Sequence, residues 1–153
     1  MKKIFLLLVL SIFAIIAKAS VTLNGINYNI NSSLCTAVVI KSNYEGDLEI
    51  PETINVDGVN YEVTEIDKYA FQNSYLLTSV RLPKSIKSIG ALAFANGKEI
   101  KIYIENLSAW CSINFGYTGS SNITGYYYDP IAQYRLFVNN SEIVNLEIPE
   151  DIN

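Results

Sequence analysis

Histidine does not occur in the 153-residue sequence, and cysteine occurs only as Cys35 and Cys111. Without histidine the chain cannot form the common Ser-His or Cys-His nucleophile pairs, and it has no imidazole to bind a metal or exchange protons near neutral pH. Calcium-binding patterns such as D-x-D-x-D-G are also absent. We therefore expect no enzymatic activity, no cofactor and no required metal.

Basic residues are outnumbered, with eleven lysines and arginines against fifteen aspartates and glutamates and a net charge of −4. No basic stripe and no alternation of basic with aromatic residues is present. An acidic excess repels phosphate groups. Nucleic acid is therefore not an expected partner.

A long apolar run occurs only at the N-terminus. A short basic segment precedes the apolar residues 4–16, and Ala17-Lys18-Ala19 has the pattern of a cleavage site. This combination predicts a secretory signal peptide over residues 1–19, cleaved before Ser20. Because the first cysteine is Cys35 and no second apolar span follows, we expect a secreted or cell-surface protein with neither a lipid anchor nor a transmembrane anchor in this chain.

The clearest positive signal is an internal repeat. Val63–Phe71 reads VTEIDKYAF and Ile86–Phe94 reads IKSIGALAF, so one apolar template recurs after 23 residues. Fixed apolar positions at a period of about 20 to 29 residues are typical of a leucine-rich-repeat solenoid, in which a repeat buries its apolar face only against its neighbours. The pattern predicts a stacked core with Phe71 and Phe94 at equivalent positions.

A short alternating segment follows the first template and predicts a strand. In Leu77–Leu82 apolar residues alternate with Ser79 and Arg81, which places these two on the solvent side. Pro83 ends the strand because proline cannot donate to a ladder. Related segments bring the predicted strand copies to four: Leu48–Glu52, Ile100–Ile104 and Leu146–Glu150. We expect short helical turns at the Ala-Phe dipeptides.

Two turn dipeptides predict hairpins ahead of the repeats. Asn24-Gly25 and Asp57-Gly58 supply the positive φ angles of a type I′ turn, and Leu34–Ile40 and Leu48–Ile50 are the segments expected to pair with these hairpins. The open end of a repeat stack would expose its core. We interpret residues 20–60 as an N-terminal cap of antiparallel strands.

The segments IPET at residues 50–53 and VTEIDKYAFQNSYLLTSVRLP at residues 63–83 resemble the BspA-like leucine-rich-repeat family of bacterial surface proteins, over about residues 44–153. Ala109–Phe115 resembles a spacer of that family, and Phe137–Glu142 resembles its hairpin, with Asn-Asn in place of Asn-Gly. The resemblance implies a BspA-like leucine-rich-repeat solenoid that is mostly β with short helical turns.

These segments divide the chain into five parts: a signal peptide at 1–19, a hairpin cap at 20–60, two leucine-rich repeats at 61–105, a tyrosine-rich connector at 106–136, and a hairpin with the start of an incomplete repeat at 137–153. Because that last repeat is incomplete, we expect a fragment of a longer array or an unprotected edge strand.

The cysteines and carboxylates have ordinary structural interpretations in this stack. Export favours a disulfide, but Cys35 and Cys111 are separated by two repeats, farther than the roughly 4.4 to 6.8 Å between Cα atoms that a bridge needs. We expect two separate buried thiols. The sequence also offers close carboxylate pairs, which we interpret as solvated because a short stack has no deep cleft: Glu45 with Asp47, Glu62 with Glu65, and Glu150 with Asp151.

The sequence thus favours recognition by a surface. A solenoid lays its outward-facing strand residues side by side, and the alternation selects one polar row: Glu49, Ser79, Arg81, Lys101, Tyr103 and Glu147. Arginine and tyrosine are favoured at protein interfaces. The alternative is that these are only solvated strand positions.

The connector offers a second candidate. Its tyrosines stand among glycines and serines, a mixture typical of adaptable binding loops, and their rings can stack on sugars: Tyr117, Tyr126, Tyr127, Tyr128 and Tyr134. The alternative is that they cover the flank of the repeats.

The resemblance implies an exported, non-catalytic protein-interaction module that takes part in adhesion to host extracellular proteins or to other cells. A glycan-binding accessory protein of the cell surface is the alternative. The expected partner is an extracellular or cell-surface protein, and a glycan is the second choice.

Overall fold

The computed structural model describes residues 19–95, 99–116 and 134–144, which form two β-sheets around one core. The first sheet holds β1 (Ala19–Leu23), β2 (Ile26–Asn31), β3 (Thr36–Val39), β5 (Thr53–Val56), β6 (Val59–Ile66), β8 (Ser88–Ile89) and β10 (Asn114–Phe115). The second holds β4 (Glu45–Glu49), β7 (Leu76–Arg81), β9 (Ile100–Ile104), β11 (Tyr134–Val138) and β12 (Ser141–Glu142). One helix, α1 (Leu107–Cys111), follows β9.

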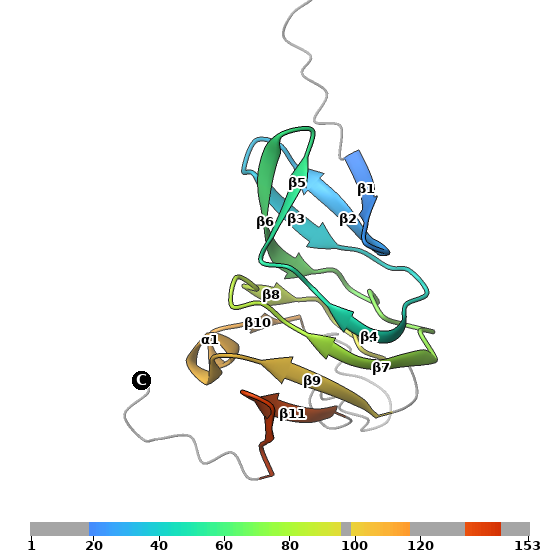
Figure 1. The fold of residues 1–153 in the computed structure, drawn as a ribbon, viewed down its shortest axis with the longest axis vertical. Helices are drawn as coiled ribbons and strands as arrows, with labels where there is room; N and C mark the ends of the chain where they lie inside the picture. Colours follow the sequence, from blue (N-terminus) through green and yellow to red (C-terminus); the bar gives the residue numbers. More distant parts are fainter. Residues whose placement is uncertain (1–18, 96–98, 117–133, 145–153) are drawn as a thin grey trace, which may run out of the picture.

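Successive repeats contribute parallel neighbours to the second sheet. β4, β7, β9 and β11 lie side by side (Figure 1), and their registers align Leu48, Val80, Ile102 and Leu136 in one row against the core. This row follows from the alternation of apolar residues along each strand. The strands predicted at Leu77–Leu82 and Ile100–Ile104 are confirmed as β7, within one residue, and β9. The strand predicted at Leu48–Glu52 is displaced, because β4 ends at Glu49, and Leu146–Glu150 lies outside the described residues.

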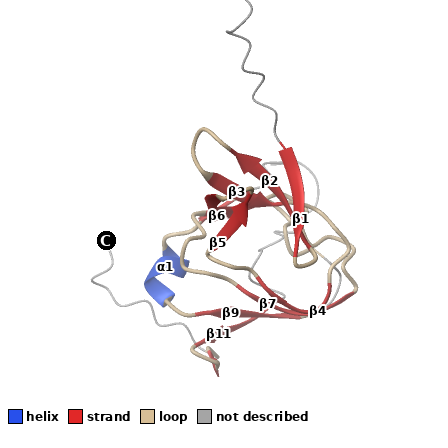
Figure 2. Cartoon of the chain, turned by 45° about the horizontal axis from the view of Figure 1, so that its top comes forward, coloured by secondary structure: helices blue, strands red, loops and turns tan. Residues whose placement is uncertain are grey.

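The first sheet changes from antiparallel to parallel along its length. β1, β2 and β3 pair antiparallel, and β3, β6, β8 and β10 then pair parallel. Figure 2 shows the two sheets on different sides of the core, joined by turns. Each repeat thus crosses from one sheet to the other, and the residues between the sheets form a continuous core.

Both predicted N-terminal hairpins are present. Asn24-Gly25 joins β1 to β2 with φ angles of 50° and 78°, and Asp57-Gly58 joins β5 to β6 with φ angles of 50° and 84°. Positive φ at both central residues is the geometry of a type I′ turn. The pairing predicted for Leu48–Ile50 is wrong, because β4 pairs with β7 in the second sheet and Thr53–Val56 supplies the hairpin strand.

An aromatic ladder runs through the core and brings the two equivalent phenylalanines of the repeat template into contact. Phe71 and Phe94 stack with ring centroids 4.8 Å apart. The ring centroid of Tyr44 lies 5.3 Å from that of Phe71, and the ring centroid of Tyr134 lies 5.3 Å from that of Phe94. Such pairs contribute about 0.5–1.5 kcal/mol beyond the area they bury. Burial also raises the pKa of Tyr134 to about 12. This connector tyrosine therefore packs against the repeats.

The Ala-Phe dipeptides lie in successive turns, so the predicted short helical turns are wrong there. Tyr69 and Leu92, which precede the two dipeptides, have φ angles of 60° and 55°, and such left-handed residues interrupt a right-handed helix. The turns are held between repeats by backbone hydrogen bonds, such as the 2.8 Å bond from the Phe71 N–H to the Ala93 carbonyl. Contact between neighbouring repeats therefore decides their conformation.

The cysteine prediction is half right. Cys35 and Cys111 are both free, as expected, but both are exposed, whereas the sequence predicted buried thiols. Cys35 lies in the turn before β3 with a φ of 51°. Cys111 ends α1, the short helix in which Trp110 is the buried residue, so Cys111 falls on the outer side of that helix.

Candidate outer-face groove

In each strand of the second sheet, the residues just before and just after the buried row point to the outer face. They form two rows of side chains there. The strand registers align Asp47, Ser79, Lys101 and Arg135 in the first row. They align Glu49, Arg81, Tyr103 and Phe137 in the second. Parallel strands lie about 4.8 Å apart, so neighbours within a row can contact each other.

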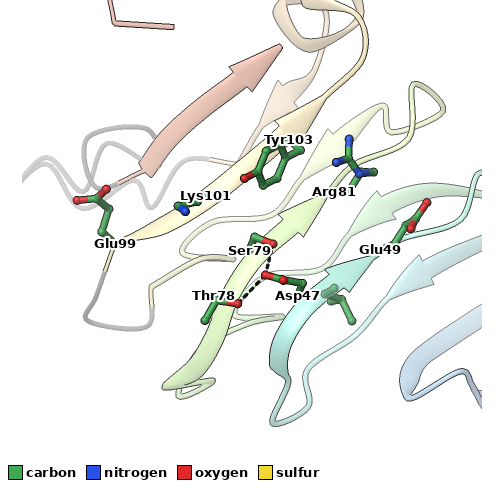
Figure 3. A pocket seen from close by; sticks show the side chains of 9 residues that line it. Asp47, Glu49, Thr78, Ser79, Arg81, Glu99, Lys101 and Tyr103 are labelled. Atoms are coloured by element: carbon green, nitrogen blue, oxygen red, sulfur yellow. Dashed lines mark hydrogen bonds between the residues drawn. The ribbon is translucent and has the colours of Figure 1, made fainter. Parts of the chain in front are cut away.

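This face is hollowed into a groove of about 610 Å³, which we call the outer-face groove (Figure 3). Most of its lining side chains are polar, and they come from three adjacent strands and the residue before β9: Asp47, Leu48, Glu49, Thr78, Ser79, Arg81, Glu99, Lys101 and Tyr103. Five of the six residues predicted for the polar row therefore lie together here: Glu49, Ser79, Arg81, Lys101 and Tyr103.

A β-bulge shapes one end of the groove. The register between β4 and β7 shifts after Gly46, so that Thr78 is the extra residue of β7, and Gly46 has a φ of +65°. A bulge redirects side chains that regular pairing would place on opposite faces. The Thr78 and Ser79 hydroxyls therefore both donate to Asp47 Oδ1, at 2.7 and 2.6 Å (Figure 3).

These hydrogen bonds fix the charge of Asp47. The Ser79 hydroxyl, followed by that of Thr78, lowers the pKa of the Asp47 carboxyl below its ordinary value, because both bonds favour the ionised form. Ser79 is only 7% exposed, although the alternation predicted it on the solvent side. It lies on the outer face as expected, but its side chain is covered and serves to orient Asp47.

A stack of planar groups forms the other row. The Arg81 guanidinium carbon lies 4.9 Å from the centroid of the Tyr103 ring, and Tyr103 stacks on Phe137 with centroids 4.8 Å apart. One Arg81 nitrogen donates to Asn140 Oδ1 at 3.1 Å. Cation–π contacts of this kind contribute on the order of 0.5–1 kcal/mol at exposed sites. They restrain Arg81, which lies on the central strand of the groove.

Arg135 continues the first row beyond Lys101, on the strand that forms the hairpin with β12. Its guanidinium is hydrogen-bonded to Glu142 at 2.5 Å through Nε, contacts the same carboxylate through Nη2, and lies 3.5 Å from Glu99. The hydrogen bond from Arg135 lowers the pKa of Glu142. Arg135 is therefore neutralised within the protein.

The sequence prediction missed several residues of this site. Asp47 was interpreted as a solvated carboxylate, and Arg135 and Phe137 fell in segments assigned to the connector and the hairpin. The alternation in Tyr134–Val138 was the available signal, because it matches the strand copies, whereas the bulge that brings Thr78 to Asp47 leaves no clear pattern in sequence. The other predicted site residues lie outside the described residues: Glu147, Tyr117, Tyr126, Tyr127 and Tyr128.

The described side chains suit reversible polar contacts. Within residues 19–95, 99–116 and 134–144, no three acidic or cysteine side chains converge in the manner of metal ligands. The carboxylate pair Glu62 and Glu65 lies on β6, away from the groove, and Glu62 accepts a 3.1 Å contact from Lys87.

No helix in the described part of the chain is long and apolar enough to cross a membrane.

Comparison with known families identifies the class of protein. A family model described as BspA type leucine rich repeat region (6 copies) matches residues 52–153. Because the match covers more than half of the sequence, the chain belongs to the BspA-type leucine-rich-repeat family, and the resemblance inferred from its motifs is confirmed. The strand-rich structure agrees with a leucine-rich-repeat fold that is mostly β.

Solved leucine-rich-repeat structures are similar to this chain. A leucine-rich repeat protein from Bacteroides ovatus is 23% identical, with a TM-score of 0.50, over 61% of this chain and 24% of that one. A leucine rich cell surface protein from Faecalibacterium prausnitzii is 23% identical, with a TM-score of 0.44, over 63% of this chain and 30% of that chain. A leucine-rich repeat protein from Bacteroides capillosus is 25% identical, with a TM-score of 0.44, over 62% of this chain and 78% of that chain.

The Bacteroides ovatus structure supports the fold alone. The similar region spans less than a third of that chain and of the Faecalibacterium prausnitzii chain. Among curated proteins, the comparison found no match.

Proposed function

We propose that this protein is an exported, non-catalytic interaction module whose outer-face groove binds an extracellular or cell-surface protein. The observation that carries the proposal is the convergence of Glu49, Arg81, Lys101 and Tyr103 on one hollowed face of parallel strands. Arginine and tyrosine dominate many protein interfaces because they combine large contact area with directed hydrogen bonds. Adhesion to host extracellular proteins or to other cells is the biological role we propose for this contact.

The same proposal assigns the remaining parts of the chain. Residues 1–19 are a signal peptide that directs export to the cell surface or the medium, and the repeats stack as a solenoid. Residues 20–60 supply the cap, chiefly through β1, β2 and β3, because antiparallel strands on the first repeat shield its core. Residues 61–105, 106–136 and 137–153 are the two repeats, the connector and the hairpin that opens a further repeat.

The test is a binding measurement with the chain purified after export. It is immobilised and presented with a panel of extracellular matrix proteins and of host and bacterial glycans at physiological salt. We expect saturable binding to a protein, weakened about tenfold by Arg81→Ala or Tyr103→Ala, because interface anchors of these types commonly contribute more than about 1.4 kcal/mol.

Two controls match these substitutions. Tyr75→Ala removes a tyrosine that is 63% exposed and lies outside the groove, and Lys68→Ala removes an exposed cation from a turn beyond β6. Neither should weaken binding. Protein binding that persists in both groove variants would refute the assignment of the groove, and binding to glycans alone would favour the connector tyrosines.

A further inference from the structure

Within the described residues, neither cation of the outer-face groove forms an ion pair, although Lys101 lies near enough to Asp47 and Glu142 to lower the pKa of both carboxyls. Among the described residues, the ion pairs involve Lys84, Lys87 and Arg135, and neither Arg81 nor Lys101 takes part in one. Both side chains line the groove (Figure 3). A ligand carboxylate can therefore approach these two positive charges without breaking an ion pair between described residues.

This arrangement is unexpected for Arg81, because a carboxylate stands beside it. Glu49 occupies the directly neighbouring position in the register between β4 and β7. The Arg81 guanidinium lies instead over Tyr103, on the opposite neighbouring strand, and donates to Asn140. The stack thus turns the cation away from Glu49.

An arginine held in this way is prepared to bind a carboxylate. A guanidinium has five N–H donors in a planar fork that matches the two oxygens of a carboxylate, and Arg81 uses one nitrogen for Asn140. Lys101 lies on the next strand, two residues before the partner of Arg81. Strand spacing and rise separate their Cα atoms by roughly 8 Å, which two long side chains can span to one carboxylate.

The acidic residues around these cations restrict the rest of the ligand. Asp47, Glu49 and Glu99 line the same groove, and the hydrogen bonds from Thr78 and Ser79 keep Asp47 ionised and fixed in place. A polyanion would be repelled by these carboxylates, and a uniformly basic segment would be repelled by Arg81 and Lys101. The charge pattern therefore fits a ligand that carries both signs close together.

We infer that Arg81 and Lys101 form a carboxylate-binding subsite for an extended protein segment of mixed charge. An acidic side chain of the segment contacts the two cations, and a neighbouring basic side chain contacts Glu49. The inference deepens the proposed function by naming the chemistry of the partner, and it rests on that function only in taking the partner to be a protein.

The test uses three synthetic peptides of equal length on a threonine-glycine background. One carries a glutamate and a lysine two residues apart, one carries two glutamates, and one carries two lysines. Their affinities for the exported full chain are measured by fluorescence anisotropy at low and at physiological salt. We expect the mixed peptide to bind about tenfold more tightly than either of the others, and Arg81→Ala to abolish this preference.

Charge reversal sharpens the experiment. Arg81→Glu should make the two-lysine peptide the preferred ligand, because the subsite then offers a carboxylate to a second lysine. Lys68→Glu makes the same charge change on a turn outside the groove and should leave the ranking unchanged. Tyr103→Leu keeps the cation but removes its stack, and should reduce the preference for the mixed peptide severalfold. Circular dichroism confirms that each variant is folded.

The outcomes separate this inference from the proposed function. Equal affinities for the three peptides, or a ranking that Arg81→Glu leaves unchanged, would overturn the subsite. If the chain binds a protein of the panel but Arg81→Glu leaves the peptide ranking unchanged, the proposed interaction module is supported and this subsite is refuted. The expected peptide ranking with no binding to any panel protein would support the subsite and refute the partner we propose.

Discussion

Asp47 depends on its immediate neighbours for its charge and its orientation. Its Oδ1 atom accepts hydrogen bonds from two adjacent hydroxyls, those of Thr78 and Ser79. Strands place adjacent residues on opposite faces, so only the bulge at Gly46 allows both hydroxyls to reach one carboxylate. The groove therefore has a fixed negative charge beside its two cations.

This contact predicts the acid titration of Asp47. A carboxylate whose folded pKa is depressed stabilises the fold fully above its unfolded pKa, and this stabilisation is lost as the pH falls through the lower folded pKa. Ser79→Ala combined with Thr78→Val removes both donors. We expect the Asp47 pKa to rise toward its ordinary value of 3.8, measured by NMR titration of the carboxyl carbon.

The control for this titration is Ser33→Ala, which removes a hydroxyl from an exposed residue outside the groove, in the turn between β2 and β3. It should leave the Asp47 pKa where it is in the parent chain. A double variant with an unaltered Asp47 titration would contradict the view that the two hydroxyls hold this carboxylate.

At the scale of single residues, period-2 alternation was enough to find most of the groove. Arg81 and Tyr103 were predicted correctly as outward neighbours, because a strand sends alternate side chains to one face whatever surrounds it. Asp47 was not predicted as part of the site, because its role depends on a bulge. A bulge is set by how two strands meet, which neither strand encodes alone.

Each repeat contributes one ring to the aromatic ladder, and this links the strands and turns into one element of structure. Phe71 and Phe94 are 0% and 2% exposed, and each contacts the ring before and after it. A ring in the middle of such a ladder has aromatic partners on both sides. Its loss leaves a cavity that the neighbouring repeats cannot close without shifting from their packed positions.

The ladder predicts a large cost for Phe94→Ala. Removing a buried phenylalanine destabilises a protein by about 3–5 kcal/mol through lost burial and the cavity left behind. Phe94→Leu should cost clearly less, because it keeps most of the buried volume. The measurement is the free energy of unfolding in urea.

Tyr75→Ala provides the comparison, because Tyr75 is 63% exposed and its truncation should change stability by about 0.5 kcal/mol or less. Similar losses for Phe94→Ala and Tyr75→Ala would show that the ladder does not support the core.

The elements differ in how far the sequence specified them. The hairpins at Asn24-Gly25 and Asp57-Gly58 were predicted correctly, because two residues with positive φ determine a type I′ turn locally. The Ala-Phe turns were assigned wrongly as helical. Their conformation depends on hydrogen bonds to the next repeat, such as that from Tyr69 to Ala91, which a single segment cannot reveal.

Over the whole molecule, the N-terminal strands and the repeats share one sheet. β3 pairs with β6 in parallel, and the Asp67 N–H donates to the Val39 carbonyl at 2.8 Å as the pairing ends. The sequence contains one tryptophan, Trp110, which is buried in α1 on the far side of the repeats. If the fold unfolds as one unit, a destabilising change in β3 should therefore shift the unfolding transition that Trp110 reports.

We predict that Val39→Ala lowers the stability of the entire fold. Val39 is fully buried, and its truncation should cost about 2 kcal/mol. Trp110 fluorescence and far-UV circular dichroism should report the same urea midpoint and the same shift, because the continuous sheet and core couple both ends.

Repeat arrays can lose this cooperativity, since each repeat contacts only its neighbours. Thr22→Ala changes an exposed strand residue of β1 outside the buried core and serves as the matched control. A Trp110 transition that stays in place while the circular dichroism transition shifts or splits would show that the N-terminal strands unfold separately.

The sequence by itself determined the family, the repeat template, the hairpin turns and the alternation that places Arg81, Lys101 and Tyr103 on one face. These features depend on local backbone preference and on the period of apolar residues, and short segments encode both. The tertiary structure decided the rest. It placed β4 beside β7, made β11 the next parallel strand, and exposed both cysteines. Pairing partners, bulges and exposure depend on contacts between residues distant in sequence, and these form only when the repeats stack.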